Sequence, residues 1–200
     1  MTLQDVGAEA RTPSQLARRE RIVAAATELL DEREYERIQI RDVADAASVA
    51  LGTLYRYFPS KQQLYAEVLL DWSRSFDTRV RARPNGATTD ADRLRAALRR
   101  TVRAYEKHPN FFRLISALEV VTDPSVADRY ADFASQYAEA LATALVDTAE
   151  EDRHAIAFVS STVLGTLLRS WSLRGTPISQ VYERIDEVVD LIFSGPRTGR

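Results

Sequence analysis

The residues of this chain whose types and spacing could do chemistry lie between Gln39 and Lys61. Thr53 and Arg56 stand three positions apart, and arginine and threonine side chains contact phosphates and base edges. Gly52 precedes them, and a residue without a Cβ lets a helix approach another molecule closely. Lys61 would add a cation at the start of the next helix, where exposed N–H groups favour an anion. This combination indicates a surface that binds nucleic acid.

Two short helices, expected at about 40–47 and 51–57, must position these side chains. Val43, Ala47 and Leu54 are apolar at the positions where two crossing helices need inward contacts. The spacing predicts a helix-turn-helix, whose second helix can lie in the major groove of DNA. Apolar residues at such spacing also occur in any pair of core helices, so a purely structural pair is the alternative on this pattern alone.

The run from Leu51 to Lys61, preceded by Ile40 to Ala44, resembles the signature of the TetR family of one-component transcriptional repressors. The similarity in motif covers about residues 22–69. Within the family, the run from Tyr35 to Lys61 is especially similar to the actinobacterial repressors of cholesterol catabolism, and so is the C-terminal stretch from Leu167 to Arg174. The resemblance implies an all-α fold, in which an N-terminal three-helix helix-turn-helix head joins a C-terminal helical bundle for ligand binding and dimerisation.

The resemblance and the residue chemistry together assign DNA contacts to side chains of the first helix, the helix-turn-helix and the start of the fourth helix. These residues are Arg18, Arg19, Gln39, Arg41, Ala50, Leu51, Gly52, Thr53, Tyr55, Arg56, Tyr57 and Lys61. A solvated charged face is the alternative for Arg18 and Arg19, and one of the two tyrosines could be partly core.

Three positions depart from the family pattern. Ser48 stands in the turn where glycine is common, and serine adopts a positive φ less easily than glycine. Ala50 stands where a serine often precedes the recognition helix, so one phosphate contact or cap is missing. Gln39 replaces a threonine or serine, although its longer side chain could still reach a phosphate. These departures affect individual contacts rather than the expected binding of DNA.

Composition sets the limits within which this interpretation must fit. The 200 residues, 45% hydrophobic and 28% charged, suit a soluble globular protein of one large or two modest domains. The net charge of −2 lacks the basic surplus of many nucleic-acid proteins, so a local basic stripe must serve and non-specific affinity should be modest. The absence of cysteine excludes disulfides and thiolate metal sites. Without a secretory signal or an apolar run of about 18 residues, a cytoplasmic protein without a membrane partner is expected.

Sparse prolines and glycines separate stretches with helical apolar spacing. Helices are expected at about 13–32, 40–47, 51–57, 61–80, 90–107, 110–121, 125–149, 151–173 and 178–194, with a loop at 82–90. The predicted domains are an N-terminal arm (1–12), the DNA-binding domain (13–61), the ligand-binding and dimerisation domain (62–194) and a tail (195–200).

A dense set of large apolar side chains on the middle helices could line an elongated cavity for a bulky hydrophobic ligand. Its members are Trp72, Phe76, Tyr105, Phe111, Phe112, Leu114, Leu118, Val121, Phe133, Tyr137, Phe158 and Trp171. Any one of them could instead be plain core. Arg99, Arg103 and Arg113 could steer an anionic part of the ligand, with surface solvation as the alternative. The resemblance suggests a sterol-derived or fatty acyl-CoA as effector, and a multidrug-type apolar effector is the alternative.

The last two long helices carry apolar stripes that could pair with a second copy of the chain. The stripes consist of Ile156, Val159, Val163, Leu167, Val181, Ile185, Val188 and Ile192. An antiparallel helix pair doubled by a two-fold axis gives a four-helix interface, while an intramolecular core is the alternative. The resemblance implies a homodimer, whose recognition helices would read a palindromic double-stranded operator at a separation of about 34 Å or modestly more.

Enzymatic interpretations find little support. His108 and His154 are the only histidines and lie far apart in the sequence, without the context of a metal site. The sequence contains no GxSxG, P-loop or GxGxxG motif. We therefore expect no catalytic residues, metal or cofactor, and keep a helical lipid or acyl-CoA carrier or enzyme as the rival class.

Overall fold

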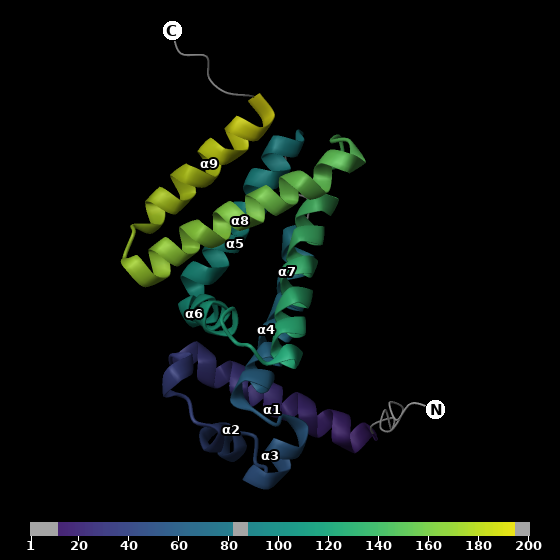
Figure 1. Cartoon of the computed structure of the whole chain (residues 1–200), viewed down its shortest axis with the longest axis vertical. Helices are drawn as coiled ribbons and strands as arrows, with labels where there is room; N and C mark the ends of the chain where they lie inside the picture. The colour runs from purple at the N-terminus through teal and green to yellow at the C-terminus, as the bar shows by residue number, and fades with distance from the viewer. Residues whose placement is uncertain (1–11, 82–87, 195–200) are drawn as a thin grey trace.

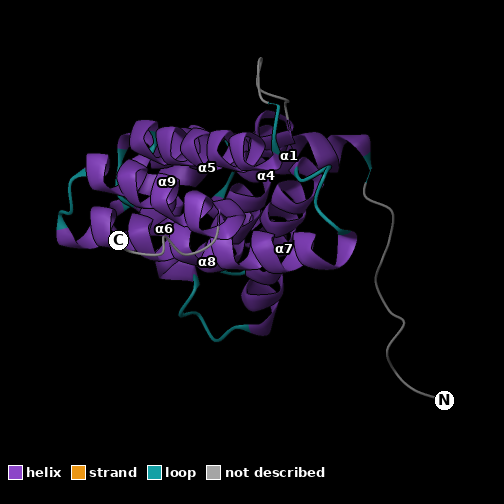
Figure 2. Ribbon diagram, turned by 90° about the horizontal axis from the view of Figure 1, so that it is seen from above, coloured by secondary structure: helices purple, strands orange, loops and turns teal. Residues whose placement is uncertain are grey.

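A computed structural model describes residues 12–81 and 88–194, with side chains between residues 75 and 87 left out. All regular elements in these ranges are helical, as predicted (Figures 1 and 2). They are α1 (Pro13–Glu32), the 3₁₀ turn η1 (Tyr35–Arg37), α2 (Ile40–Ala46), α3 (Leu51–Tyr57), α4 (Lys61–Arg81), α5 (Asp90–Lys107), α6 (Pro109–Leu118), α7 (Pro124–Ala144), α8 (Glu150–Arg174) and α9 (Ile178–Ser194).

The helices α1, α2 and α3 form a head at one end of the molecule (Figure 1). Ile22 of α1, Val43 of α2 and Leu54 of α3 are completely buried, as the helix-turn-helix spacing requires. Tyr65 of α4 is also completely buried, and its ring meets that of Tyr35 edge-on at 5.2 Å between centroids. The head is therefore closed on its inner side by the first turns of α4.

The helix α4 leaves the head and runs among the helices α5 to α9, which together with α4 we call the body (Figure 1). It packs along α7 and also against α5 and α6. The helices α8 and α9 run side by side on the outside of the body and contact α7 and α5 respectively. One core of buried apolar side chains runs through head and body.

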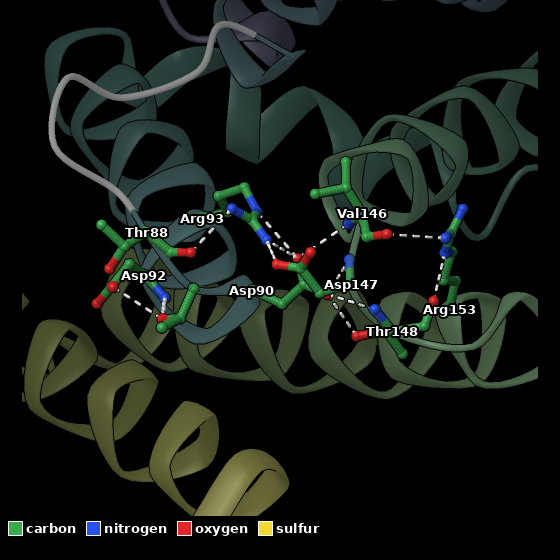
Figure 3. A network of polar contacts seen from close by, with 9 residues as sticks. Thr88, Asp90, Asp92, Arg93, Val146, Asp147, Thr148 and Arg153 are labelled. Atoms are coloured by element: carbon green, nitrogen blue, oxygen red, sulfur yellow. Dashed lines mark hydrogen bonds and ion pairs between the residues drawn. The ribbon is translucent and has the colours of Figure 1, made fainter.

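The helix α7 is shorter than predicted, because a distant carboxylate holds the chain after it. The sequence predicts a helix to residue 149, but α7 ends at Ala144. Asp90 at the start of α5 is 5% exposed, and it accepts hydrogen bonds from the main-chain N–H groups of Val146 (2.9 Å), Asp147 (2.9 Å) and Thr148 (2.7 Å) (Figure 3). These three N–H groups donate to the carboxylate instead of to the carbonyls four residues earlier, so the helix does not continue.

Arg93 neutralises the buried carboxylate of Asp90, since its Nε lies 2.9 Å from Oδ1. Burial raises the pKa of Asp90, but the hydrogen bonds from Thr148, Arg93 and Val146 outweigh it and hold the pKa below its ordinary value. A carboxyl with a lower pKa in the folded chain stabilises the fold when it is ionised. This contribution is present above the unfolded pKa and is lost as the pH falls through the folded one.

We expect Asp90→Asn to lower the free energy of unfolding by about 2 kcal/mol at neutral pH, because an amide cannot serve the loop's N–H groups as a charged acceptor. The difference between the two proteins should shrink as the pH falls below about 4, where the native carboxyl becomes protonated too. Urea unfolding followed by circular dichroism at several pH values measures both effects.

The matched control is Asp92→Asn in the same helical turn. The Asp92 side chain is 44% exposed, and its partners Thr89 and Arg95 lie in the same turn rather than in the loop, so a smaller loss is expected. Equal losses in the two variants would show that Asp90 does not hold the loop.

Candidate nucleic-acid interface and internal cavity

The helix α3 presents an outer face that the fold itself does not use. Gly52, Tyr55 and Arg56 are exposed on this face, while Leu54 points inward. A Cβ added at Gly52 would meet no atom within 4 Å, and its φ is not positive. Neither packing within the chain nor backbone conformation therefore requires glycine at this position. Glycine here leaves open space through which another molecule could approach α3 closely.

The cations of this surface fall into two groups. Arg41 and Arg56 are exposed and form no ion pair with any described residue. Arg19 instead lies 2.7 Å from the buried carboxylate of Glu67, with its guanidinium Cζ 5.2 Å from the ring centroid of Phe58. Arg41 and Arg56 are therefore free to meet an anionic partner without breaking an existing contact.

Lys61 is also engaged within the chain. Its Nζ donates a hydrogen bond to the main-chain carbonyl of Tyr35 and lies 4.1 Å from the centroid of the Tyr35 ring. Burial lowers the pKa of Lys61, although Glu36 partly opposes the effect. Lys61 thus fastens η1 to the start of α4, a role that the sequence did not indicate.

The other predicted DNA contacts lie on the head with different exposure. Gln39 and Ala50 are exposed, whereas Arg18, Leu51, Thr53 and Tyr57 are half-buried. The main-chain N–H of Gln39 donates to Asp42 Oδ2 at 3.1 Å, which closes the first turn of α2. Ala50 begins α3 without a side-chain cap.

Ser48 adopts the left-handed conformation in the turn between α2 and α3, with φ of 54°. Glycine is common at this position in the family pattern. Its N–H still donates to the carbonyl of Asp45 at 3.1 Å, and the next N–H, of Val49, reaches the carbonyl of Ala44 at 2.9 Å. The turn keeps its form with serine, at the cost of a side chain in an unfavourable region.

The body contains a cavity of about 470 Å³ between α5, α6, α7 and α8. Five of the predicted lining residues lie on its wall: Tyr105, Phe112, Phe133, Tyr137 and Phe158. The other described members of the predicted set belong to the surrounding core. Phe111 stacks on Trp72 at 4.4 Å between ring centroids, Leu114 and Leu118 are buried, and Val121 and Trp171 pack against the core. The side chain of Phe76 lies outside the described residues.

The polar groups of the cavity were not found from the sequence. The phenol of Tyr137 donates to Thr101 Oγ1 at 3.0 Å, and burial raises the pKa of both Tyr137 and Tyr105, so the phenols stay neutral. Glu119 and Arg169 are the only charged residues of the described wall, and they form an ion pair with each other. The described wall is therefore mostly apolar, with serine and threonine side chains among the aromatic ones and a single charge pair.

The predicted arginines do not line this cavity. Arg99 pairs with Asp186 of α9, with Nε at 3.0 Å from Oδ1, and Arg113 pairs with Glu34. Arg103 is exposed and interacts with Tyr182. Arg169 is the cation of the described wall instead, and it lies eleven residues, or about three helical turns, after the predicted wall residue Phe158 on α8, a spacing that could have revealed it.

The helices α8 and α9 carry the predicted dimer surface. Val159 is 47% exposed, and the half-buried members of the predicted stripe are Ile156, Val163, Leu167, Val188 and Ile192. Val181 and Ile185 are only 1% and 2% exposed, so they belong to the chain's own core rather than to a free surface. Leu191, 57% exposed, was missed.

The apolar character of α8 lies largely outside the core. In the described part of the chain, α8 alone is long and apolar enough to cross a membrane by length and composition, with a mean hydropathy of 1.2 and 22% of its most apolar window buried. Helices of soluble proteins pass the same test. An apolar helix left uncovered on the outside of a bundle is a typical protein–protein interface.

Comparisons with known proteins agree in family and in fold. The family described as "Bacterial regulatory proteins, tetR family" matches residues 22–68. The HTH-type transcriptional repressor KstR of Rhodococcus jostii is 32% identical over 181 residues, which cover 90% of this chain and 84% of the repressor.

Two solved structures share the fold. A TetR transcriptional regulator from Rhodococcus sp. RHA1 is 28% identical, with a TM-score of 0.75 over 89% of this chain and 96% of that one. Thermus thermophilus FadR, a repressor in complex with lauroyl-CoA, is 18% identical, with a TM-score of 0.69 over 91% of this chain and 96% of that one.

We expect Ser48→Gly to raise the free energy of unfolding by about 1 kcal/mol, because glycine adopts the positive φ of this turn without steric cost. The matched control is Ala46→Gly, at the exposed last residue of α2, where glycine should lower stability by about 0.5–1 kcal/mol. Thermal and urea unfolding compare the two variants. Loss of stability in both would contradict strain at Ser48.

Proposed function

The chain belongs to the TetR family of bacterial regulatory proteins, and from this premise we propose that it is a ligand-responsive repressor that binds a palindromic DNA operator as a homodimer. The sequence similarity to actinobacterial repressors of cholesterol catabolism, the KstR proteins, is confirmed. In this proposal residues 13–61 read DNA, residues 62–194 bind the effector and dimerise, and the protein works in the cytoplasm.

The observation that carries the proposal is the unused outer face of α3. Gly52 has open space where a side chain would be, and the adjacent Arg56 has no acidic partner in the described structure. A base pair or phosphate brought against Gly52 would lie within reach of Arg56, and arginine bonded to guanine is the commonest specific contact in DNA complexes. Arg41 on α2 supplies a second free cation for the phosphate backbone.

A dimer through α8 and α9 would present two such faces. Val159 and Leu191 form the exposed part of this surface, and the half-buried apolar residues beside them would be covered by the same contact. The two-fold axis of such a dimer matches the two-fold symmetry of a palindrome. The net charge of −2 favours specific base contacts over indiscriminate electrostatic binding.

We propose a bulky apolar effector with one anionic end, of the acyl-thioester class, for the cavity between α5 and α8. A volume of about 470 Å³ and walls of neutral aromatic side chains suit an apolar body. At Arg169 an anionic group of the effector could replace the carboxylate of Glu119. An effector without charge would leave this ion pair intact, so the pair distinguishes the two classes.

The effector acts in this proposal by favouring one arrangement of the dimer over another. Binding must be tighter in the arrangement whose heads do not fit the operator, because equal affinity for both arrangements would shift nothing. The wall of the cavity includes residues of α7, which packs along α4, and α4 begins in the head. A ligand that displaces α7 would therefore shift α4, and through α4 the DNA-binding surface.

We expect Gly52→Ala to weaken operator binding about ten-fold or more while leaving the protein as stable or more stable. The added methyl group meets nothing in the chain but would meet the DNA. The operator is first selected with the native protein from genomic fragments, and affinities are then measured by fluorescence anisotropy beside thermal unfolding.

The matched control is Arg74→Ala, which removes an exposed arginine paired with Asp71 on α4, and it should leave binding unchanged. If native protein selects no palindrome, or if Gly52→Ala binds the operator as well as native protein, the DNA-binding proposal is wrong.

We expect Gly165→Leu to abolish release from DNA by an effector without preventing operator binding. A Cβ at Gly165 meets no atom within 4 Å, so the side chain can enter the cavity and occupy it. Palmitoyl-CoA and cholanoyl-CoA serve as probes, with binding followed by calorimetry and release by anisotropy. Ala131→Leu, an exposed position on α7 outside the cavity wall, is the control.

Arg169→Gln separates the two effector classes. It should weaken palmitoyl-CoA about ten-fold if the anionic end meets Arg169, and it should not affect an uncharged probe such as cholestenone. Tight binding of cholestenone alone would favour the multidrug-type alternative.

A further inference from the structure

A buried carboxylate joins the head to the body at the point where α4 passes between them. Glu67 lies in the apolar run from Leu64 to Leu70 on α4, and its side chain is 6% exposed. Its Oε2 is 2.7 Å from Arg19 Nη2 of α1 and 2.9 Å from Arg129 Nη1 of α7. One carboxylate oxygen is thus shared by an arginine of the head and an arginine of the body.

The buried carboxylate of Glu67 destabilises the fold unless it keeps its contacts with Arg19 and Arg129. Burying a charged group is unfavourable without a partner, and an apolar side chain of similar size is often at least as stabilising as a buried ion pair. Neither arginine has another acidic partner among the residues that the structure describes. Without the charge of Glu67, the Arg19 and Arg129 side chains, 21% and 47% exposed, would face each other across a small cleft between head and body with no acid between them, and their solvent-screened repulsion would loosen the contact between α1 and α7.

On the head side, the cluster reaches the end of the recognition helix. The guanidinium of Arg19 lies over the ring of Phe58, 5.2 Å from its centroid, and Phe58 directly follows α3. The N–H of Phe58 donates to the carbonyl of Leu54 at 2.9 Å, which holds its backbone to the last turn of α3, and the residue is buried at 4% exposure, which holds its ring. A movement of Arg19 therefore acts on α3 through one rigid contact.

On the body side, the cluster reaches the cavity. Arg129 precedes Tyr130 on α7, and Tyr130 and Phe133 belong to the cavity wall. A second contact holds the start of α7 to α4, because Gln63 Nε2 donates to Ser125 Oγ at 2.8 Å. The first turns of α7 thus contact both the cavity and the cluster of Glu67, Arg19 and Arg129.

We propose that Glu67 is a positioning residue that fixes the angle of the DNA-binding head on the body, and that its pairs with Arg19 and Arg129 carry a displacement of α7 to the head. The proposal rests on the proposed DNA-binding function for its consequence, although its geometric part does not. In a dimer, the angle of each head determines the separation of the two recognition helices, and therefore which spacing between half-sites is read.

The geometric part is tested by a distance that involves neither DNA nor effector. The chain has no cysteine, so Arg37→Cys on the head and Glu183→Cys on the body provide two clean sites for spin labels. Labelled chains are diluted with unlabelled native chains, so that only distances within one chain are measured. Native protein should give a single narrow distribution, and Glu67→Gln in this background should give a broader or shifted one. An unchanged distribution would overturn the proposal.

The functional part is tested by spacer discrimination. Operators with the spacer lengthened or shortened by a single base pair are compared with the selected operator. Arg129→Gln keeps the pair between Arg19 and Glu67, so the head stays intact, but it releases the body side. We expect the preference for the original spacing to fall about ten-fold or more. A purely structural role would weaken binding to all spacings equally, and that result would also overturn the proposal.

Two further variants complete the test. Arg74→Gln at an exposed ion pair of α4 should leave both readouts unchanged. Should Glu67→Gln unfold, combining it with Arg129→Leu removes one of the two facing cations, and the double variant should fold and still show the broader head distribution. If native protein binds no operator, the proposed function fails, whereas the distance measurement still decides the role of Glu67.

Discussion

The helix α4 is buried on every side where it passes between head and body, and this constraint governs how the molecule can move. Seven consecutive residues, from Leu64 to Leu70, are buried, which for a helix means that neighbours surround the whole circumference. In one direction α4 closes the core of the head through Tyr65, and in the other it packs along α7. Such packing admits discrete rearrangements rather than gradual deformation, so in the proposed mechanism an effector in the cavity would move α4 and the head together.

The polar contacts at the two ends of α7 restrict how this helix can move relative to the head and to α5. Apolar packing tolerates sliding, whereas the buried carboxylate of Glu67 keeps its contacts with the two arginines only in a narrow range of geometry. Glu67 fixes α1 to α7 at one point, and Asp90 fixes the loop after α7 to the start of α5 at the other end of that helix. Between these two anchored ends lies the stretch of α7 that lines the cavity. A ligand that presses on this stretch works against two fixed points.

The sequence predicted the helices well because their ends depend on local chemistry. Proline is favoured at the first helical position, and Pro13, Pro109 and Pro124 each begin a helix, in two cases one residue before the expected start. The turn at Ser48 was recognised from the family pattern instead. The end of α7 was not, since it depends on Asp90, which lies more than fifty residues away in the sequence and approaches only in the folded chain.

The roles of single charged residues were less predictable. The sequence pattern around a cation on an amphipathic helix is the same whether the cation contacts DNA, solvent or a buried carboxylate. Arg19 and Arg56 looked alike in the sequence, yet one contacts Glu67 and the other has no acidic partner among the described side chains. The signal that separates them is the acid rather than the base. Glu67 interrupts an apolar run, a position that an unpaired carboxylate cannot occupy in a folded protein. A charged residue inside an apolar helical run therefore predicts that one of the chain's cations is committed to it, and is not available to a partner molecule.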